Sequence, residues 1–88
     1  ESMGVANARA QFSGMLALYH TQVPGALKAK VVNPNSFAVT EAIRDADKAA
    51  ETALSLYNFS KDQGFDDDAD YFANAIEHLR HQKERFTQ

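Results

Sequence analysis

The sequence predicts an all-α fold, a small antiparallel three-helix bundle that forms one domain over residues 1–88. Apolar residues recur at helical steps of three, four or seven along most of the chain. Proline and glycine divide these stretches at Pro24-Gly25, Pro34 and Gly64. A chain of 88 residues buries only about 60 to 65% of the surface of its unfolded form, so we expect a thin core.

The N-terminal helix is predicted over residues 5–22 and ends at Pro24-Gly25. Gly14 lies inside this helix, where glycine lowers helix stability by up to about 1 kcal/mol relative to alanine. We therefore expect Gly14 to be a packed position, where another backbone approaches closely. Residues 24–32 form either a short helical turn or an extended connector, and we favour the turn. The apolar face of the helix consists of Val5, Phe12, Met15, Leu16, Tyr19 and Val23.

The second helix is predicted over residues 36–63, with Ser36 or Asn35 as N-cap and Gly64 just past its end. Its middle is rich in alanine, which lets a neighbouring helix approach closely. Val39, Leu56 and Phe59 fall outside the main face, so this helix is expected to be central or shared with a second subunit. The main face consists of Phe37, Ile43, Ala46, Ala50, Ala53, Leu54 and Tyr57.

The third helix is predicted over residues 66–86 and forms an antiparallel hairpin with the second. Three aspartates, Asp66 to Asp68, open it and complement the positive end of the helix dipole. The connection through Gly64 is short, as is usual between neighbouring antiparallel helices. The apolar face consists of Phe65, Ala69, Phe72, Ile76, Leu79 and Phe86.

Composition excludes several classes of protein. The absence of cysteine excludes disulfides and thiolate metal sites. The net charge is −3, and the acidic part of the chain is residues 36–88, with eleven acidic and six basic residues. Because no Lys/Arg stripe is visible either, we expect no nucleic-acid partner. We expect no membrane partner, because no apolar run approaches the roughly 18 to 20 residues that span a bilayer. A cytoplasmic protein with Met3 as native start is expected, although a protein whose signal peptide was removed would look the same.

Two patterns resemble metal sites. Glu77, His81 and Glu84 lie on one flank of the third helix, with His78 further round, and a closed site would take a fourth ligand such as His20 or a symmetry mate. The alternative interpretation is a solvated face of weak salt bridges. The second pattern has the spacing of a calcium loop, but Tyr71 replaces its glycine and helical periodicity runs through it, which favours a helix start. That pattern consists of Asp66, Asp68, Asp70, Asn74 and Glu77.

No nucleophile with a base and an orienting acid, and no phosphate-binding glycine loop, is recognisable, so we expect neither an enzyme nor a cofactor. The sequence predicts a protein–protein interaction module, an accessory, regulatory or adaptor protein that forms a homodimer. Leu56, Phe59 and Tyr71 are the candidate partner-binding residues. The alternative function is a metal-binding bundle that uses Glu77, His78, His81 and Glu84. A third hypothesis is that the acidic residues of 41–70 mimic nucleic acid or bind a basic partner.

Overall fold

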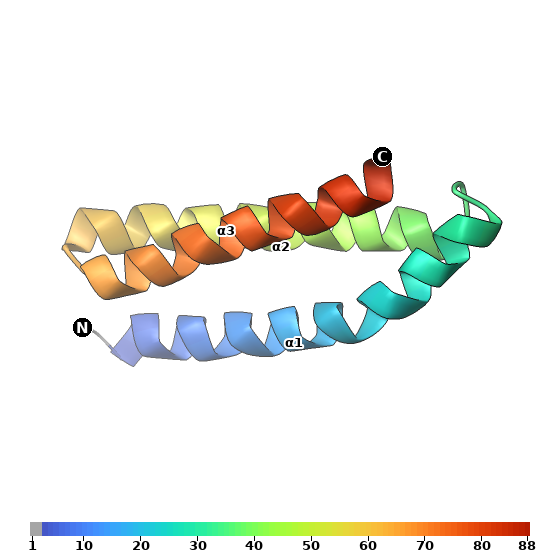
Figure 1. Cartoon of the computed structure of the whole chain (residues 1–88). Coiled ribbons are helices and arrows are strands. Elements are labelled where there is room, and N and C mark those ends of the chain that lie inside the picture. Colours follow the sequence, from blue (N-terminus) through green and yellow to red (C-terminus); the bar gives the residue numbers. More distant parts are fainter. Residues whose placement is uncertain (1–2) are drawn as a thin grey trace.

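The structure, a computed structural model that describes residues 3–88, is a bundle of three helices. Helix α1 spans Met3–Val32, α2 spans Phe37–Gln63 and α3 spans Asp66–Thr87. Figure 1 shows that α2 and α3 form an antiparallel hairpin and that α1 runs antiparallel to α2, hence parallel to α3. The predicted all-α three-helix bundle is therefore confirmed. Glu1 and Ser2, expected to precede the native start, lie outside the described residues.

The ends of α2 are those that the sequence predicts. Ser36, rather than Asn35, is the N-cap, and its side chain accepts a hydrogen bond from the amide of Val39. Gly64 has a φ of 78°, the left-handed conformation that lacks a steric penalty only in glycine. The amide of Phe65 then donates to the carbonyl of Ser60, at 2.8 Å, and the chain reverses into α3.

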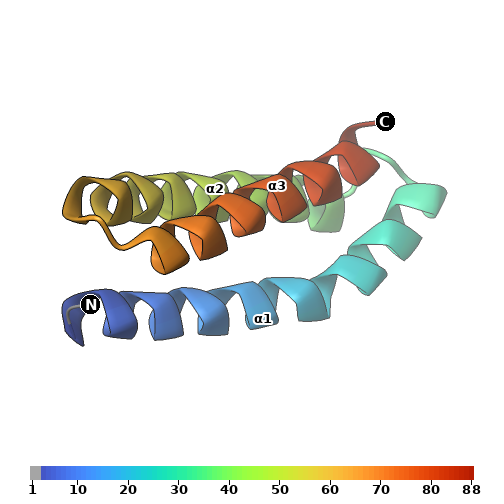
Figure 2. The same cartoon turned by 60° about the vertical axis from the view of Figure 1, so that its left-hand side comes forward.

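Helix α1 is longer than predicted. It continues through Pro24 to Val32, so the predicted stop after residue 22 is wrong, and the favoured helical turn at 24–32 is part of α1. Proline has no amide hydrogen, so the carbonyl four residues earlier loses its helical partner and a bend, not necessarily an end, results. Figures 1 and 2 show this change of direction in the C-terminal part of α1.

The core is built around a stripe of buried alanines on α2, which we call the alanine stripe: Ala42, Ala46, Ala49 and Ala53. These small side chains let α1 and α3 approach α2 from two sides, and large side chains of α1 and α3 fill the remaining space. Phe72 of α3 is fully buried and meets Phe12 of α1 edge-on, with 5.7 Å between ring centroids. The buried part of α2 consists of Val39, Ala42, Ala46, Ala49, Ala53 and Ser60.

Two residues predicted for the buried face of α2 are instead exposed. Phe37 is 77% exposed and Leu54 is 51% exposed, whereas Val39, expected off the main face, is buried. Phe37 lies about 200° around the helix from Val39, since each residue turns the helix by about 100°. The alanine stripe therefore decides which face is buried, and larger apolar residues elsewhere on α2 remain outside.

Gly14 is not packed, contrary to expectation. A Cβ atom added there would meet nothing within 4 Å apart from its own helix and neighbours. We expect Gly14→Ala to raise the free energy of unfolding by up to about 1 kcal/mol, because alanine loses less backbone entropy in a helix. Urea unfolding followed by circular dichroism measures this. As a control, Gly64→Ala should destabilise the protein, since its φ is positive; equal effects of the two substitutions would contradict this explanation.

Candidate functional site

Polar side chains link the parallel helices α1 and α3 at four levels, which together we call the α1–α3 seam. Each contact joins residues 55 to 59 positions apart in the sequence. The near-constant separation arises because parallel helices advance by the same rise per residue. The four contacts are Arg9 to Asp68, Ser13 to Tyr71, His20 to His78, and Lys30 to the carbonyl of Arg85.

The first level of the seam is a partly buried ion pair. Nη1 of Arg9 lies 2.9 Å from Oδ1 of Asp68, whose side chain is only 4% exposed, while that of Arg9 is 41% exposed. The guanidinium also lies over the Tyr71 ring, 4.2 Å from its centroid. A buried carboxylate needs such a partner, because desolvation without one is costly. Arg9 therefore ties the start of α1 to the first turn of α3.

The third level is a pair of histidines. Nε2 of His20 and Nε2 of His78 lie 2.8 Å apart, and the two rings meet at an interplanar angle of 85°. One nitrogen must donate and the other accept, so the contact requires at least one neutral imidazole. Partial burial lowers the pKa of His78 below its usual 6.5, and electrostatic interaction with His20 and His81 lowers it further.

This lowered pKa predicts a pH dependence of stability. The unfolded chain takes up a proton at His78 before the folded protein does, so the free energy of unfolding should fall as pH drops below about 6.5. Urea unfolding between neutral and mildly acidic pH, in metal-free buffer, measures this fall. In His78→Gln the fall should be smaller than in the wild type. Identical pH profiles of the two proteins would show that the histidine pair contributes nothing.

The predicted metal cluster is divided in the structure. His81 lies between Glu77, at 3.6 Å, and Glu84, at 4.0 Å, on an exposed flank of α3. His78 faces away from that flank toward His20, the residue that the sequence suggests as a fourth ligand. Within residues 3–88 no group of three or more His, Cys, Asp or Glu side chains could hold a metal ion.

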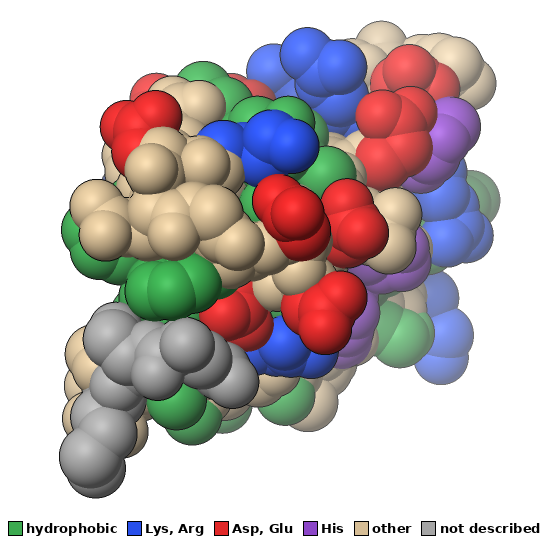
Figure 3. Space-filling model, turned by 90° about the vertical axis from the view of Figure 1, so that its left-hand side faces the viewer, with side chains coloured by type: hydrophobic (Ala, Val, Ile, Leu, Met, Phe, Trp, Pro, Cys, Tyr) green, Lys and Arg blue, Asp and Glu red, His purple; other side chains and the backbone are tan. Residues whose placement is uncertain are grey.

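The residues with calcium-loop spacing lie along the helical backbone of α3 rather than in a loop. Asp66 and Asp67 line a cavity of about 320 Å³ together with Arg9 and Gly64. The carboxylate of Asp68 forms the ion pair with Arg9. Figure 3 shows acidic side chains gathered on the end of the molecule where α2 turns into α3. This part of the chain is the acidic helix start that the sequence favours.

A row of three cavities runs between α1 and α2, and we call it the α1–α2 groove. Their volumes are about 220, 440 and 250 Å³. The first two share Ala8 and Leu56, and the last two share Met15, so the cavities follow one another along the helices. All lining residues come from α1 and α2. Leu18, which is 72% exposed, and Phe59, which is 48% exposed, are among them.

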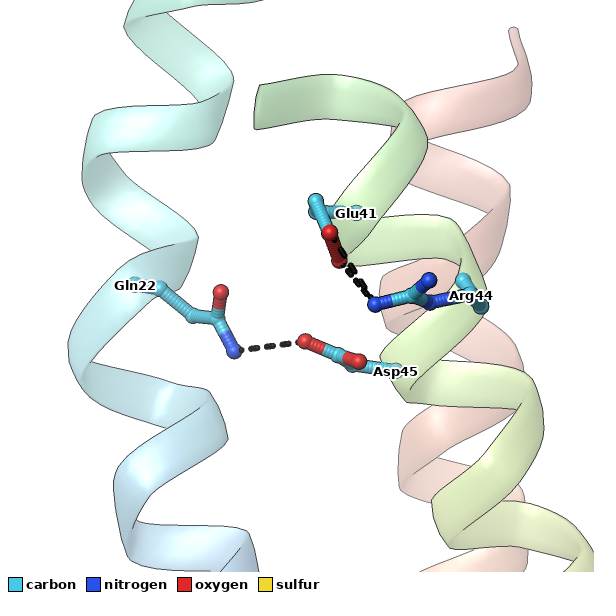
Figure 4. A network of polar contacts seen from close by, with 4 residues as sticks. All are labelled: Gln22, Glu41, Arg44 and Asp45. Atoms are coloured by element: carbon cyan, nitrogen blue, oxygen red, sulfur yellow. Dashed lines mark hydrogen bonds and ion pairs between the residues drawn. The ribbon is translucent and has the colours of Figure 1, made fainter. Parts of the chain in front are cut away.

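Polar contacts lie at the end of the groove nearest the α1–α2 connection. Nε2 of Gln22 on α1 donates to Oδ2 of Asp45 on α2 at 3.1 Å, and Arg44 is paired to Glu41 beside this contact (Figure 4). Burial and the negative charge of Asp45 raise the pKa of Tyr19, so its phenol stays neutral. Lys48 lines the same end of the groove. The rest of the groove offers apolar and uncharged polar side chains.

The candidate partner-binding residues separate into two locations. Leu56 and Phe59 line the α1–α2 groove, whereas Tyr71 lies in the α1–α3 seam against Arg9, Ser13 and Phe12. Sequence reasoning missed Leu18 as a surface residue and Arg9 as the partner of Asp68. For the pair of Arg9 and Asp68, the available signal was the position of Asp68 beside the apolar residues of α3.

Comparison with known proteins gives no relative. The chain matches no family model, no curated protein and no solved structure. Within the described residues, none of the helices combines the length and apolar character needed to cross a bilayer.

Proposed function

We propose that this chain is a protein–protein interaction module without enzymatic activity, and that it self-associates through the α1–α2 groove. The observation that carries the proposal is the groove itself. It extends from Gly4 to Gln22 along α1, about 27 Å at the rise of an α-helix, and none of its lining residues belongs to α3. An apolar groove of this length between two helices suits a third helix laid along it.

The side chains of the groove support a protein partner over a small ligand. Leu18 and Phe59 stand exposed near its two ends, as anchor residues do before a partner covers them. Gln11, Thr52 and Ser55 supply uncharged polar atoms between them. Charged side chains are confined to one end of the groove, whereas the smaller set of residues around the cavity between α2 and α3 includes Asp47, Glu51 and Arg80.

The small size of the bundle and the exposed apolar side chains of the groove support self-association. A small bundle leaves apolar surface that a second copy can cover, and closed dimers are the commonest assembly of a single chain. The same face on two copies would bring two α1–α2 pairs together, in the manner of a four-helix bundle. The module would then present its acidic end and α3 to further partners.

Sedimentation velocity from low to high micromolar concentration tests this proposal. We expect the wild type to form dimers and Leu18→Glu to remain monomeric, because two glutamates would be buried at the interface. Leu54→Glu is the matched control, since Leu54 is also exposed but lines the α2–α3 cavity. A strictly monomeric wild type at high micromolar concentration, or equal loss of dimer in both variants, would contradict the proposal.

A further inference from the structure

The histidine pair of the α1–α3 seam brings two metal-binding nitrogens together from separate helices. Nε2 of His20 on α1 and Nε2 of His78 on α3 are 2.8 Å apart although the residues are 58 positions apart in the sequence. Both residues are exposed, so the rings are open to solvent and to an incoming ion. We propose that His20 and His78 form a two-histidine site for a divalent transition-metal ion. The bound ion would link α1 to α3.

The geometry is close to what such an ion needs. Zn²⁺ binds imidazole nitrogen at about 2.0 to 2.1 Å, so two nitrogens of a tetrahedral site lie about 3.3 Å apart. The Nε2 atoms must therefore separate by about half an ångström, and the rings must turn so that both lone pairs point at the ion. Exposed side chains can make this adjustment by rotation about their own bonds. The ion would replace the hydrogen bond that now joins the rings.

The choice of metal follows from the ligands. Imidazole nitrogen suits Zn²⁺, Ni²⁺ and Cu²⁺, whereas Mg²⁺ prefers oxygen ligands. Because residues 3–88 contain no third His, Cys, Asp or Glu side chain in position, water completes the coordination of the ion. This site differs from the flank of Glu77, His81 and Glu84, which lies on another face of α3.

Binding at this position would stabilise the fold. The contact between α1 and α3 is smaller than the contact of either helix with α2, so a metal ion bound across it would strengthen the least extensive of the three helix contacts. The unfolded chain does not hold His20 near His78, so the ion binds the folded state preferentially. This inference goes beyond the proposed self-association and does not depend on it.

Thermal unfolding of the full chain, prepared without an affinity tag, tests the site with ZnCl₂, NiCl₂ and MgCl₂. At a free Zn²⁺ or Ni²⁺ concentration ten times Kd, the unfolding equilibrium constant should fall about tenfold. The Tm should then rise by about 5 to 10 °C, and Mg²⁺ should have no effect. His20→Gln and His78→Gln should each abolish the rise. His81→Gln, the matched control on the same helix, should retain it.

Three results would overturn the site. A Zn²⁺-induced rise in Tm that survives in both His20→Gln and His78→Gln would place the ion elsewhere. A loss in His81→Gln equal to that in His78→Gln would assign the ion to the Glu77, His81 and Glu84 flank. NMR of the imidazole nitrogens provides a second readout in the wild type, where Zn²⁺ should shift the Nε2 signals of His20 and His78. No shift of these two signals at saturating Zn²⁺ would likewise contradict the proposal.

Discussion

Replacing Phe72 with alanine is expected to lower the free energy of unfolding by about 3 to 5 kcal/mol. The ring is completely buried and lies edge-on to Phe12 and Tyr71, with 5.7 and 5.3 Å between centroids. Its loss would leave a cavity where α1 and α3 meet. A chain of this length has a total stability of about 4 to 13 kcal/mol, so the variant would be partly or wholly unfolded. Urea unfolding followed by circular dichroism measures the change.

Phe37→Ala is the matched control for this substitution. Phe37 is 77% exposed at the start of α2, so its removal should change the free energy of unfolding by no more than about 0.5 kcal/mol. The sequence alone predicts the opposite for Phe37, because it places that residue on the buried face. A large loss of stability in Phe37→Ala, or a small one in Phe72→Ala, would mean that the core described above is wrong.

Arg9→Ala is expected to cost about 2 to 3 kcal/mol, because it leaves the buried carboxylate of Asp68 without its partner. The cost is below the 3 to 5 kcal/mol typical of fully buried pairs, since the Arg9 side chain is 41% exposed and water screens it. The substitution also removes the guanidinium from the Tyr71 ring. Urea unfolding at neutral pH measures the loss.

A double-mutant cycle shows whether the cost belongs to the ion pair. Arg9→Ala should be much less harmful when Asp68 is also replaced by asparagine, because no uncompensated charge then remains. Arg44→Ala is the control, since its pair with Glu41 lies on the surface and should contribute under about 1 kcal/mol. Additive effects of the Arg9 and Asp68 substitutions would rule out the pair as a link between α1 and α3.

The helical hairpin could be predicted from the sequence because its signals are local. Ser36 and Gly64 mark the ends of α2, and the periodic apolar residues of α3 define its buried face. The course of α1 could not be predicted, because Pro24 permits either an end or a bend, and packing against α2 decides between them. The exposure of Phe37 also depends on packing. The alanine stripe becomes the buried face of α2 only because α1 and α3 pack against it, and Phe37 lies outside that face.

The candidate sites were less predictable because they depend on which helices become neighbours. The separation of 58 residues between His20 and His78 has no meaning in the sequence until α1 and α3 are known to be parallel. The same holds for Arg9 and Asp68. Leu56 and Phe59 can be recognised from the sequence, because their position off the main apolar face of α2 is a local signal. Both line the α1–α2 groove.

Concentration-dependent amide NMR spectra test the central claim, that the α1–α2 groove is the surface for self-association, most directly. As concentration rises into the high micromolar range, signals of groove residues such as Ala8, Leu18 and Thr52 should shift or broaden together. Signals of exposed residues of α3, such as Asn74 and Arg80, should stay in place. Spectra that do not change with concentration, or changes confined to α3, would contradict the claim.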